Sequence, residues 1–244
     1  MATLFISDLH LCPSRPAITR LFQDFLSGPA RAAEALYILG DLFEYWAGDD
    51  DLGDPFNAAV CAALRSLSDT GVPITFMAGN RDFLAGEGFA RAAGLRLLPE
   101  PALIDLAGTA TLLLHGDTLC TDDTAYLAFR AEVRSPEWRQ AFLALPLAQR
   151  KAQIEALRRE SEAQKRSKPM EIMDVTPDAV LQGLTFHRCT RLIHGHTHRP
   201  AHHVLEAAGR PCERWVLPDW YEKGGYLACD EDGCRLLDWP AEDG

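Results

Sequence analysis

The sequence has few of the features that would place a protein in a membrane, on nucleic acid or in a disulfide-stabilised fold. No apolar run approaches the roughly 20 residues of a membrane-spanning helix. The N-terminus lacks the basic and apolar segments of a secretory signal. The seven cysteines form no Cys-x-x-Cys pair and are odd in number, which argues against a disulfide framework or a zinc ribbon and fits a reducing cytoplasm. The net charge of −11 argues against non-specific nucleic-acid binding, which needs a basic field.

What is present is an ordinary globular composition with a regular alternation of elements. The 244 residues are 47% hydrophobic and 24% charged, enough for one large domain or for a domain with an insertion. Short apolar runs predict strands at 3–6, 35–39, 73–78, 111–114 and 191–193, with shorter β-like runs at 203–205, 215–217, 226–228 and 235–237. Helical patterns lie between them, up to about 26, at 55–70 with Asp54 as N-cap, at 86–93, and after Pro177.

A polar residue of metal-binding type follows each long apolar run. These residues are Asp8 with His10, Asp41, Asn80, His115, and His196 with His198. Open α/β sheets place their sites at the carboxyl ends of the strands, so we expect these side chains to meet. Asp8 and His10 are two residues apart and would leave an extended chain on the same face. A satisfied polar residue at a strand end is the alternative for any single member. An oxygen and nitrogen donor set without thiolate suits Mn²⁺ or Fe²⁺.

The order of these motifs resembles the calcineurin-like metallophosphoesterase superfamily. Its pattern of Asp-x-His, Gly-Asp, Gly-Asn-Arg-Asp, His and Gly-His-x-His runs here from Asp8 to His198. The resemblance implies a four-layer αββα sandwich and a dinuclear centre, in which a hydroxide held by two metals attacks phosphorus. By position, the first metal takes Asp8, His10, Asp41 and His198, and the second takes Asp41, Asn80, His115 and His196. His194 has no place in the pattern and is interpreted as a supporting residue.

Longer stretches resemble one family within that superfamily, the UDP-2,3-diacylglucosamine pyrophosphatases of lipid A biosynthesis in Gram-negative bacteria. They lie at 7–11, 39–44, 79–84, 115–123, 171–175 and 194–200. The resemblance implies a hydrolase acting on a phosphorus-containing anhydride, which splits UDP-2,3-diacylglucosamine into UMP and 2,3-diacylglucosamine 1-phosphate (lipid X) with two Mn²⁺ per subunit. It also implies a cytoplasmic protein held peripherally at the cytoplasmic face of the inner membrane, with no nucleic-acid partner. We expect a single domain over residues 1–244, with a helical lid inserted at about 123–167.

The resemblance also implies a set of substrate contacts. These are Asn80, Arg81, Asp123, Ser161, Lys165, Lys168 and His196, with Lys165 standing where the family often has Asn. Arginine cannot donate a proton near neutral pH, so we expect Arg81 to grip the diphosphate as a fixed cation while Asp82 orients it. The alternative is a structural Arg81–Asp82 surface pair. The acidic and aromatic stretch 43–51 is predicted to be a surface loop.

The segment 123–167 is helical in pattern, with Pro136 and Pro146 as breaks. It is rich in apolar residues, and between 150 and 168 it has seven basic residues against three acidic ones, a balance of +4 that leaves −15 for the rest of the chain. We expect it to cover the metal centre, to enclose acyl chains with side chains such as Phe142 and Leu143, and to meet phosphates at the membrane surface with its basic residues. The alternative is that the apolar residues pack on the core and the charges form a solvated helix face.

Three other functions compete with this hypothesis. A protein phosphatase or nuclease of this superfamily often carries His after the ligand Asn, where this chain has Arg81. A scaffold that had lost its metals should lack ligands, whereas all seven are present. A soluble nucleotide pyrophosphatase would have no use for the apolar insertion. Acyl-chain length and oligomeric state stay open.

Overall fold

Two β-sheets lie face to face in this computed structural model, which describes residues 1–165 and 174–240, with side chains described up to 159 and from 174 onward. The first sheet has the order β11-β10-β1-β2-β3-β4 and the second the order β5-β6-β7-β9-β8. The strands of the first sheet are β1 (Thr3–Ile6), β2 (Ala35–Leu39), β3 (Ile74–Met77), β4 (Arg96–Leu98), β10 (Gly224–Asp230) and β11 (Gly233–Trp239). Those of the second are β5 (Ala102–Leu106), β6 (Thr109–Leu113), β7 (Arg191–His194), β8 (Ala201–Ala207) and β9 (Arg210–Val216).

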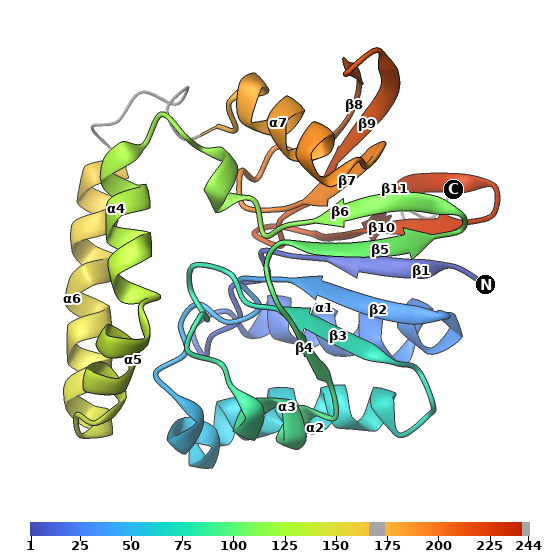
Figure 1. The fold of residues 1–244 in the computed structure, drawn as a ribbon. Coiled ribbons are helices and arrows are strands. Elements are labelled where there is room, and N and C mark those ends of the chain that lie inside the picture. The colour runs from blue at the N-terminus through green and yellow to red at the C-terminus, as the bar shows by residue number, and fades with distance from the viewer. Residues whose placement is uncertain (166–173, 241–244) are drawn as a thin grey trace.

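Helices cover the outer face of each sheet and complete the predicted four-layer sandwich (Figure 1). The first sheet carries α1 (Pro16–Ser27), α2 (Pro55–Ser68) and α3 (Glu87–Ala93), and the second carries α7 (Pro177–His187). Three short 3-10 turns lie at Pro29–Ala32 (η1), Asp49–Gly53 (η2) and Asp117–Leu119 (η3). Asp54 caps α2 as predicted, because its carboxylate accepts the backbone N–H groups of Phe56 and Asn57.

Three apolar clusters correspond to the three interfaces between layers. Phe5, Leu39 and Ile193 belong to the cluster between the sheets. The helices α1, α2 and α3 pack against the other face of the first sheet, and α7 packs against the second. Strands β1 to β3 are therefore buried on both faces, which explains why they appear in the sequence as unbroken apolar runs rather than as alternating patterns.

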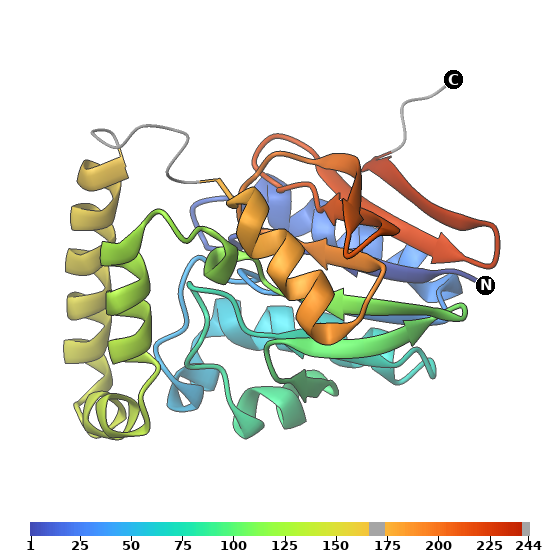
Figure 2. The ribbon, with the colours of Figure 1, turned by 45° about the horizontal axis from the view of Figure 1, so that its top comes forward.

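The insertion forms three helices that lie beside one another at one end of the molecule (Figures 1 and 2). They are α4 (Thr124–Val133), α5 (Pro136–Leu143) and α6 (Leu147–Lys165). The predicted breaks separate them, since α5 begins at Pro136 and α6 begins directly after Pro146. Within residues 1–165 and 174–240, no helix has both the length and the apolar character to cross a bilayer.

Several details of the sequence interpretation were wrong or incomplete. Strands β4 and β5 were missed because they are short and partly exposed, so that neither gives a clear periodic signal. Cys229 and Cys234 form one disulfide across the β10–β11 hairpin, although no framework of disulfides exists and the other five cysteines are free. The stretch 43–51 is not a surface loop, since Phe43, Trp46 and Ala47 are buried in or beside the outer core of the first sheet.

Candidate metal centre and its surroundings

The strand topology brings all seven predicted ligands to one edge of the sandwich. Asp8 with His10, Asp41 and Asn80 follow the parallel neighbours β1, β2 and β3, and His115 and His196 with His198 follow the parallel neighbours β6 and β7. Parallel strands end at a common edge, so residues more than a hundred positions apart meet there.

The backbone at these residues is not extended, which corrects one part of the prediction. Asp8, His10, Asp41, His196 and His198 all have positive φ values, between 49° and 68°. Asp8 and His10 therefore converge through two left-handed turns after β1, and not because an extended chain alternates its side chains. Aspartate and histidine are among the few non-glycine residues that adopt this conformation with any frequency.

One group of donors surrounds Asp8, which is fully buried. His198 Nε2 lies 3.4 Å from Asp8 Oδ1, and His10 Nε2 lies 3.5 Å from His198 Nε2. One donor atom from each of Asp8, His10 and His198 lies within 4.8 Å of the other two. His10 Nε2 is also 3.9 Å from Asp41 Oδ2. These four residues are the set predicted for the first metal.

A second group lies on the other side of Asp41. His115 Nε2 is 3.7 Å from Asp41 Oδ1 and 3.0 Å from Asn80 Oδ1. His196 Nδ1 is also 3.0 Å from Asn80 Oδ1. Asp41 thus presents one carboxylate oxygen to each group, as a bridging ligand would.

The donor atoms fit divalent ions. Asp8 Oδ1, which faces His198, is buried without a hydrogen-bond partner among the described residues. His10 faces the centre with Nε2, and its Nδ1 faces Glu44. Burial lowers the pKa of His10, which keeps its lone pairs available. Burial would raise the pKa of Asp8, but the close contact with His198 and the other nearby histidines outweigh it and hold that pKa below its usual value. A set of carboxylate, amide and imidazole donors without thiolate suits a metal such as Mn²⁺.

Arg81 lies at the rim of this centre, but Asp82 does not orient it. Asp82 is fully buried and accepts backbone N–H groups from Leu42 and Gly79, each at 2.8 Å. Its role is to hold the two loops that carry Asp41 and Asn80, and neither the predicted orienting role nor an Arg81–Asp82 surface pair is observed. The carboxylate nearest to the Arg81 guanidinium is Glu44, at 3.9 Å.

A buried polar network behind His115 was missed by sequence reasoning. Glu100 accepts the backbone N–H of His115 at 2.7 Å with Oε1 and a hydrogen bond from Arg130 at 2.5 Å with Oε2. Asp117 Oδ2 accepts from Arg130 Nε at 2.8 Å and from the Tyr126 hydroxyl at 2.5 Å. No periodic signal marks this network, because its members come from three separate segments.

The insertion is attached to the core by ion pairs between its basic residues and the acidic stretch 44–54. Arg158 lies 2.7 Å from Glu44, Lys151 lies 2.7 Å from Asp51, and the buried Arg150 pairs with Asp50. These three basic residues are therefore neutralised by the core, contrary to the expectation that they meet phosphates.

The apolar residues of the insertion divide into two classes. Phe142 is buried in the core and stacks on Trp138 with ring centroids 4.5 Å apart. The prediction that Phe142 encloses acyl chains is therefore wrong, and the alternative, that it packs on the core, is confirmed. Phe129, Leu143 and Leu157 are about 40% exposed, at 42%, 39% and 41%.

The other predicted contacts are placed only in part. Asp123 caps α4 by accepting the N–H of Tyr126 at 3.1 Å. Ser161 and Lys165 belong to α6, but their side chains lie outside the described ones, and Lys168 lies outside the described residues. His194 is fully buried and donates from Nδ1 to the carbonyl of Gly195 at 2.9 Å, as expected of a supporting residue.

The family model and similar curated proteins point to the same family. Residues 1–200 match the model of the family described as "Calcineurin-like phosphoesterase". A protein of Aromatoleum aromaticum named "UDP-2,3-diacylglucosamine hydrolase" is 58% identical over 96% of this chain and 95% of its own length. Proteins of the same name from Xanthomonas oryzae pv. oryzae and an Enterobacter species are 54% and 52% identical, over 97% and 98% of this chain and 98% and 100% of their own lengths.

Proposed function

Because this chain belongs to the calcineurin-like phosphoesterase family, and because relatives over half identical along nearly its whole length carry one enzyme name, we propose that it hydrolyses UDP-2,3-diacylglucosamine in lipid A biosynthesis. The products are UMP and 2,3-diacylglucosamine 1-phosphate. The observation that carries the proposal is the 58% identity over 95% of the Aromatoleum protein. The seven gathered donors support it, since hydrolysis of a phosphoanhydride is typical two-metal chemistry.

We propose that the gathered donors hold two divalent ions, most suitably Mn²⁺. Asp8, His10 and His198 would hold the first and Asn80, His115 and His196 the second, with Asp41 between them. When bound, such ions supply an activated water and neutralise charge on phosphate oxygens. The strand ends from which the ligands come place all seven, and burial further fixes Asp8, His10, Asp41 and His115.

Arg81 is suited to bind the diphosphate. Its side chain is mostly buried at the rim of the centre, with only 14% exposed. A guanidinium can pair with two phosphate oxygens at once and stabilise charge that develops on the departing phosphate. The exposed Phe129, Leu143 and Leu157 of the insertion are suited to the acyl chains and to the inner-membrane surface, where the substrate resides.

The test is UMP release from UDP-2,3-diacylglucosamine, with a UDP-glucosamine derivative lacking acyl chains and a phosphopeptide as comparison substrates. We expect Mn²⁺-dependent release of UMP from the diacyl substrate, with far less turnover of the other two. Preferred turnover of the phosphopeptide would replace this function with that of a protein phosphatase. Full activity in a protein shown to be free of metal would refute the two-metal chemistry.

Two variants separate the roles of the ligands. Asp41→Ala should abolish activity at every Mn²⁺ concentration, because Asp41 serves both ions. His10→Ala should be partly rescued by excess Mn²⁺, since Asp8, Asp41 and His198 remain around the first ion. Equal rescue of both variants would contradict a bridging role for Asp41.

A further inference from the structure

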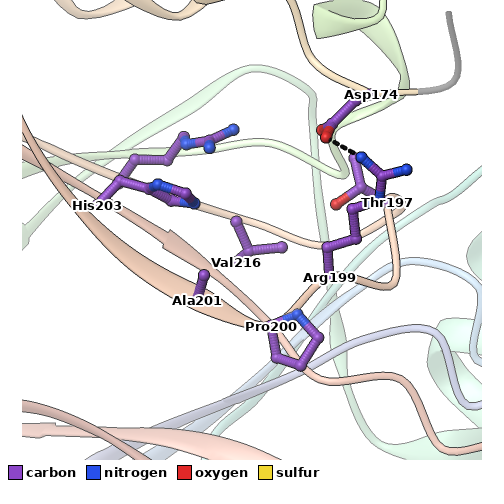
Figure 3. A pocket seen from close by; sticks show the side chains of 8 residues that line it. Asp174, Thr197, Arg199, Pro200, Ala201, His203 and Val216 are labelled. Atoms are coloured by element: carbon purple, nitrogen blue, oxygen red, sulfur yellow. Dashed lines mark hydrogen bonds and ion pairs between the residues drawn. The ribbon is translucent and has the colours of Figure 1, made fainter. Parts of the chain in front are cut away.

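A hollow of about 240 Å³ lies where the loop after β7 meets β8 and β9 of the second sheet (Figure 3). It is lined by Asp174, Thr197, Arg199, Pro200, Ala201, His203, Arg214 and Val216. Thr197 stands between His196 and His198, so one wall of the hollow is continuous with the candidate metal centre. The volume is smaller than that of a typical pocket for a whole ligand, which is roughly 300–1,000 Å³, and suits one part of a larger molecule.

The hollow carries more positive than negative charge in an acidic protein. Arg199 pairs with Asp174, as Figure 3 shows, which neutralises one cation. Arg214 is half-buried and forms no ion pair among the described residues, although Asp174 in the same hollow acts on it electrostatically. Burial still outweighs Asp174 and lowers the pKa of Arg214, so an anionic ligand that contacted it would reduce the cost of keeping this cation partly buried.

The position of the hollow indicates which half of the substrate it could take. The insertion helices α4 to α6 lie at one end of the molecule and α7, β8 and β9 lie away from them in both ribbon views. We propose that this hollow, which we call the nucleotide hollow, binds the uridine monophosphate end of the substrate. Arg214 would face phosphate, the Arg199–Asp174 pair would form one wall, and the Thr197 hydroxyl would bond to a ribose hydroxyl. This inference rests on the proposed function.

The experiment measures UMP binding by calorimetry and steady-state kinetics in Arg214→Gln. Arg235→Gln is the matched control, because Arg235 is an exposed arginine on the β10–β11 hairpin. We expect Arg214→Gln to weaken UMP binding and to raise KM for the UDP substrate by tenfold or more. The factor by which Arg214→Gln raises KM should be at least tenfold smaller for bis(p-nitrophenyl) phosphate, a diester without a nucleoside. The control should match the natural protein.

The outcomes separate this inference from the proposed function. Unchanged UMP affinity and KM in Arg214→Gln, in a protein that splits the UDP substrate, would overturn the nucleotide hollow and leave the function standing. Inorganic phosphate that binds as tightly as UMP would also overturn it, because the hollow would then be a simple anion site. A natural protein that binds UMP in an Arg214-dependent way but does not split the substrate would refute the function alone.

A second inference comes from two carboxylates that connect the insertion with the metal ligands. Glu44 lies 3.5 Å from His10 Nδ1 with one oxygen and 2.7 Å from Arg158 of α6 with the other. Glu100 holds the backbone N–H of His115 at 2.7 Å with one oxygen and Arg130 of α4 at 2.5 Å with the other. The first bridge thus joins α6 to His10, a predicted ligand of the first metal. The second joins α4 to His115, a predicted ligand of the second metal.

We infer that Glu44 and Glu100 are positioning residues, through which the seating of α4 and α6 sets the placement of His10 and His115. Glu44 lies at the outer ring nitrogen of His10, whereas Glu100 holds the backbone of His115, whose ring bonds to the Leu39 carbonyl. Loss of outer partners that place ligating histidines typically weakens metal affinity by roughly 10–100-fold. The insertion would therefore act on metal binding as well as on substrate.

The test is Mn²⁺ affinity, measured by calorimetry on metal-free protein rather than by activity. Glu100→Gln, Arg130→Met and Arg158→Met should each weaken Mn²⁺ binding by tenfold or more. The Arg130→Met and Glu100→Gln effects should be strongly non-additive, because both changes break one bridge. Glu155→Gln is the control, since Glu155 pairs with Arg159 on the exposed face of α6.

Two results would overturn this second inference. One is an Mn²⁺ affinity within twofold of the natural value in Arg130→Met and Arg158→Met. The other is a pair of observations that would indicate general destabilisation. The losses of Mn²⁺ affinity would add up in the Arg130→Met, Glu100→Gln double variant, and Glu155→Gln would lose as much affinity as the single variants. If Glu100→Gln fails to fold, the two arginine variants still decide, because their residues lie on the insertion and not in the sheets.

Discussion

The ligand residues adopt backbone conformations that cost energy. Left-handed φ values at non-glycine residues cost of the order of 1–3 kcal/mol each when the surrounding structure imposes them, and five of the seven candidate ligands have such values. Asp82 stabilises part of this arrangement through backbone N–H groups of the loops after β2 and β3. Strain concentrated at one edge of a sandwich marks a functional site.

At the same scale, Arg81 should matter for the diphosphate more than for the fold. Arg81→Ala should lower kcat by roughly 10²–10³-fold, the typical effect of removing one donor that stabilises charge in the transition state. Arg81→Lys should recover only part of this, because an ammonium cannot form a two-pronged pair. The measurement is steady-state UMP release, with the exposed Arg20→Ala as control; unchanged kcat and KM in Arg81→Ala would contradict the role.

At the scale of elements, α6 is held to the core by charges that titrate in opposite directions. The hydrogen bond from Arg150 lowers the pKa of Asp50 below its usual 3.8. Burial would lower the pKa of Lys151, but its hydrogen bond with Asp51 outweighs this and raises it above 10.5. The Asp50 contribution is therefore complete above pH 3.8 and is lost as the pH falls through the folded value. The Lys151 contribution is complete below pH 10.5 and is lost as the pH rises through the folded value.

This linkage predicts a specific effect of Asp50→Asn. The free energy of unfolding of the natural protein should fall more between about pH 6 and about pH 3 than that of the variant, because the variant lacks this titration. Urea unfolding at several pH values measures it, with the exposed Asp232→Asn as control. Parallel pH profiles for Asp50→Asn and the natural protein would exclude a contribution from this ion pair.

The exposed apolar side chains of the insertion make a separate prediction. Phe129→Ser and Leu157→Ser should reduce kcat/KM for the diacyl substrate by roughly tenfold or more, since burying such a side chain contributes about 1.5–3 kcal/mol. Both should have little effect on a deacylated analogue. Phe186→Ser, at an 81% exposed position on α7, is the control. Equal losses on the two substrates would show that these residues do not contact acyl chains.

At the scale of the molecule, the fold should survive without metal. The three apolar clusters between the layers include none of the seven donors, so chelation should leave the sandwich folded. If Mn²⁺ binds the folded state alone, as proposed, it should stabilise that state by about 2.7 kcal/mol at a hundred times its Kd. For a chain of this size that corresponds to a rise in Tm of roughly 5–11 °C. Differential scanning calorimetry measures the shift, and an unfolded chelated protein or an equal shift in Asp41→Ala would contradict it.

The order of most elements and the gathering of the seven candidate donors at one edge were accessible from the sequence, for a physical reason. Strands buried on both faces leave unbroken apolar runs, and the residue after each run must lie at the carboxyl edge of a sheet. Asp54, Pro136 and Pro146 mark helix starts through local hydrogen bonding and φ restriction, which neighbours in the chain determine. The donor set was predicted from the family motifs, and its role as metal ligands stays a prediction.

Only the tertiary structure decided the contacts between distant segments. The partners of Asp82, Glu44 and Glu100, the neutralisation of the basic α6 by the stretch 44–54, and the burial of Phe142 depend on which elements meet in space. A charge run has the same sequence pattern whether it faces solvent, lipid or a carboxylate, and an apolar side chain has the same identity in a core as in a lid. The sequence therefore determined the chemistry of this protein, and packing determined which of its side chains remain free to perform it.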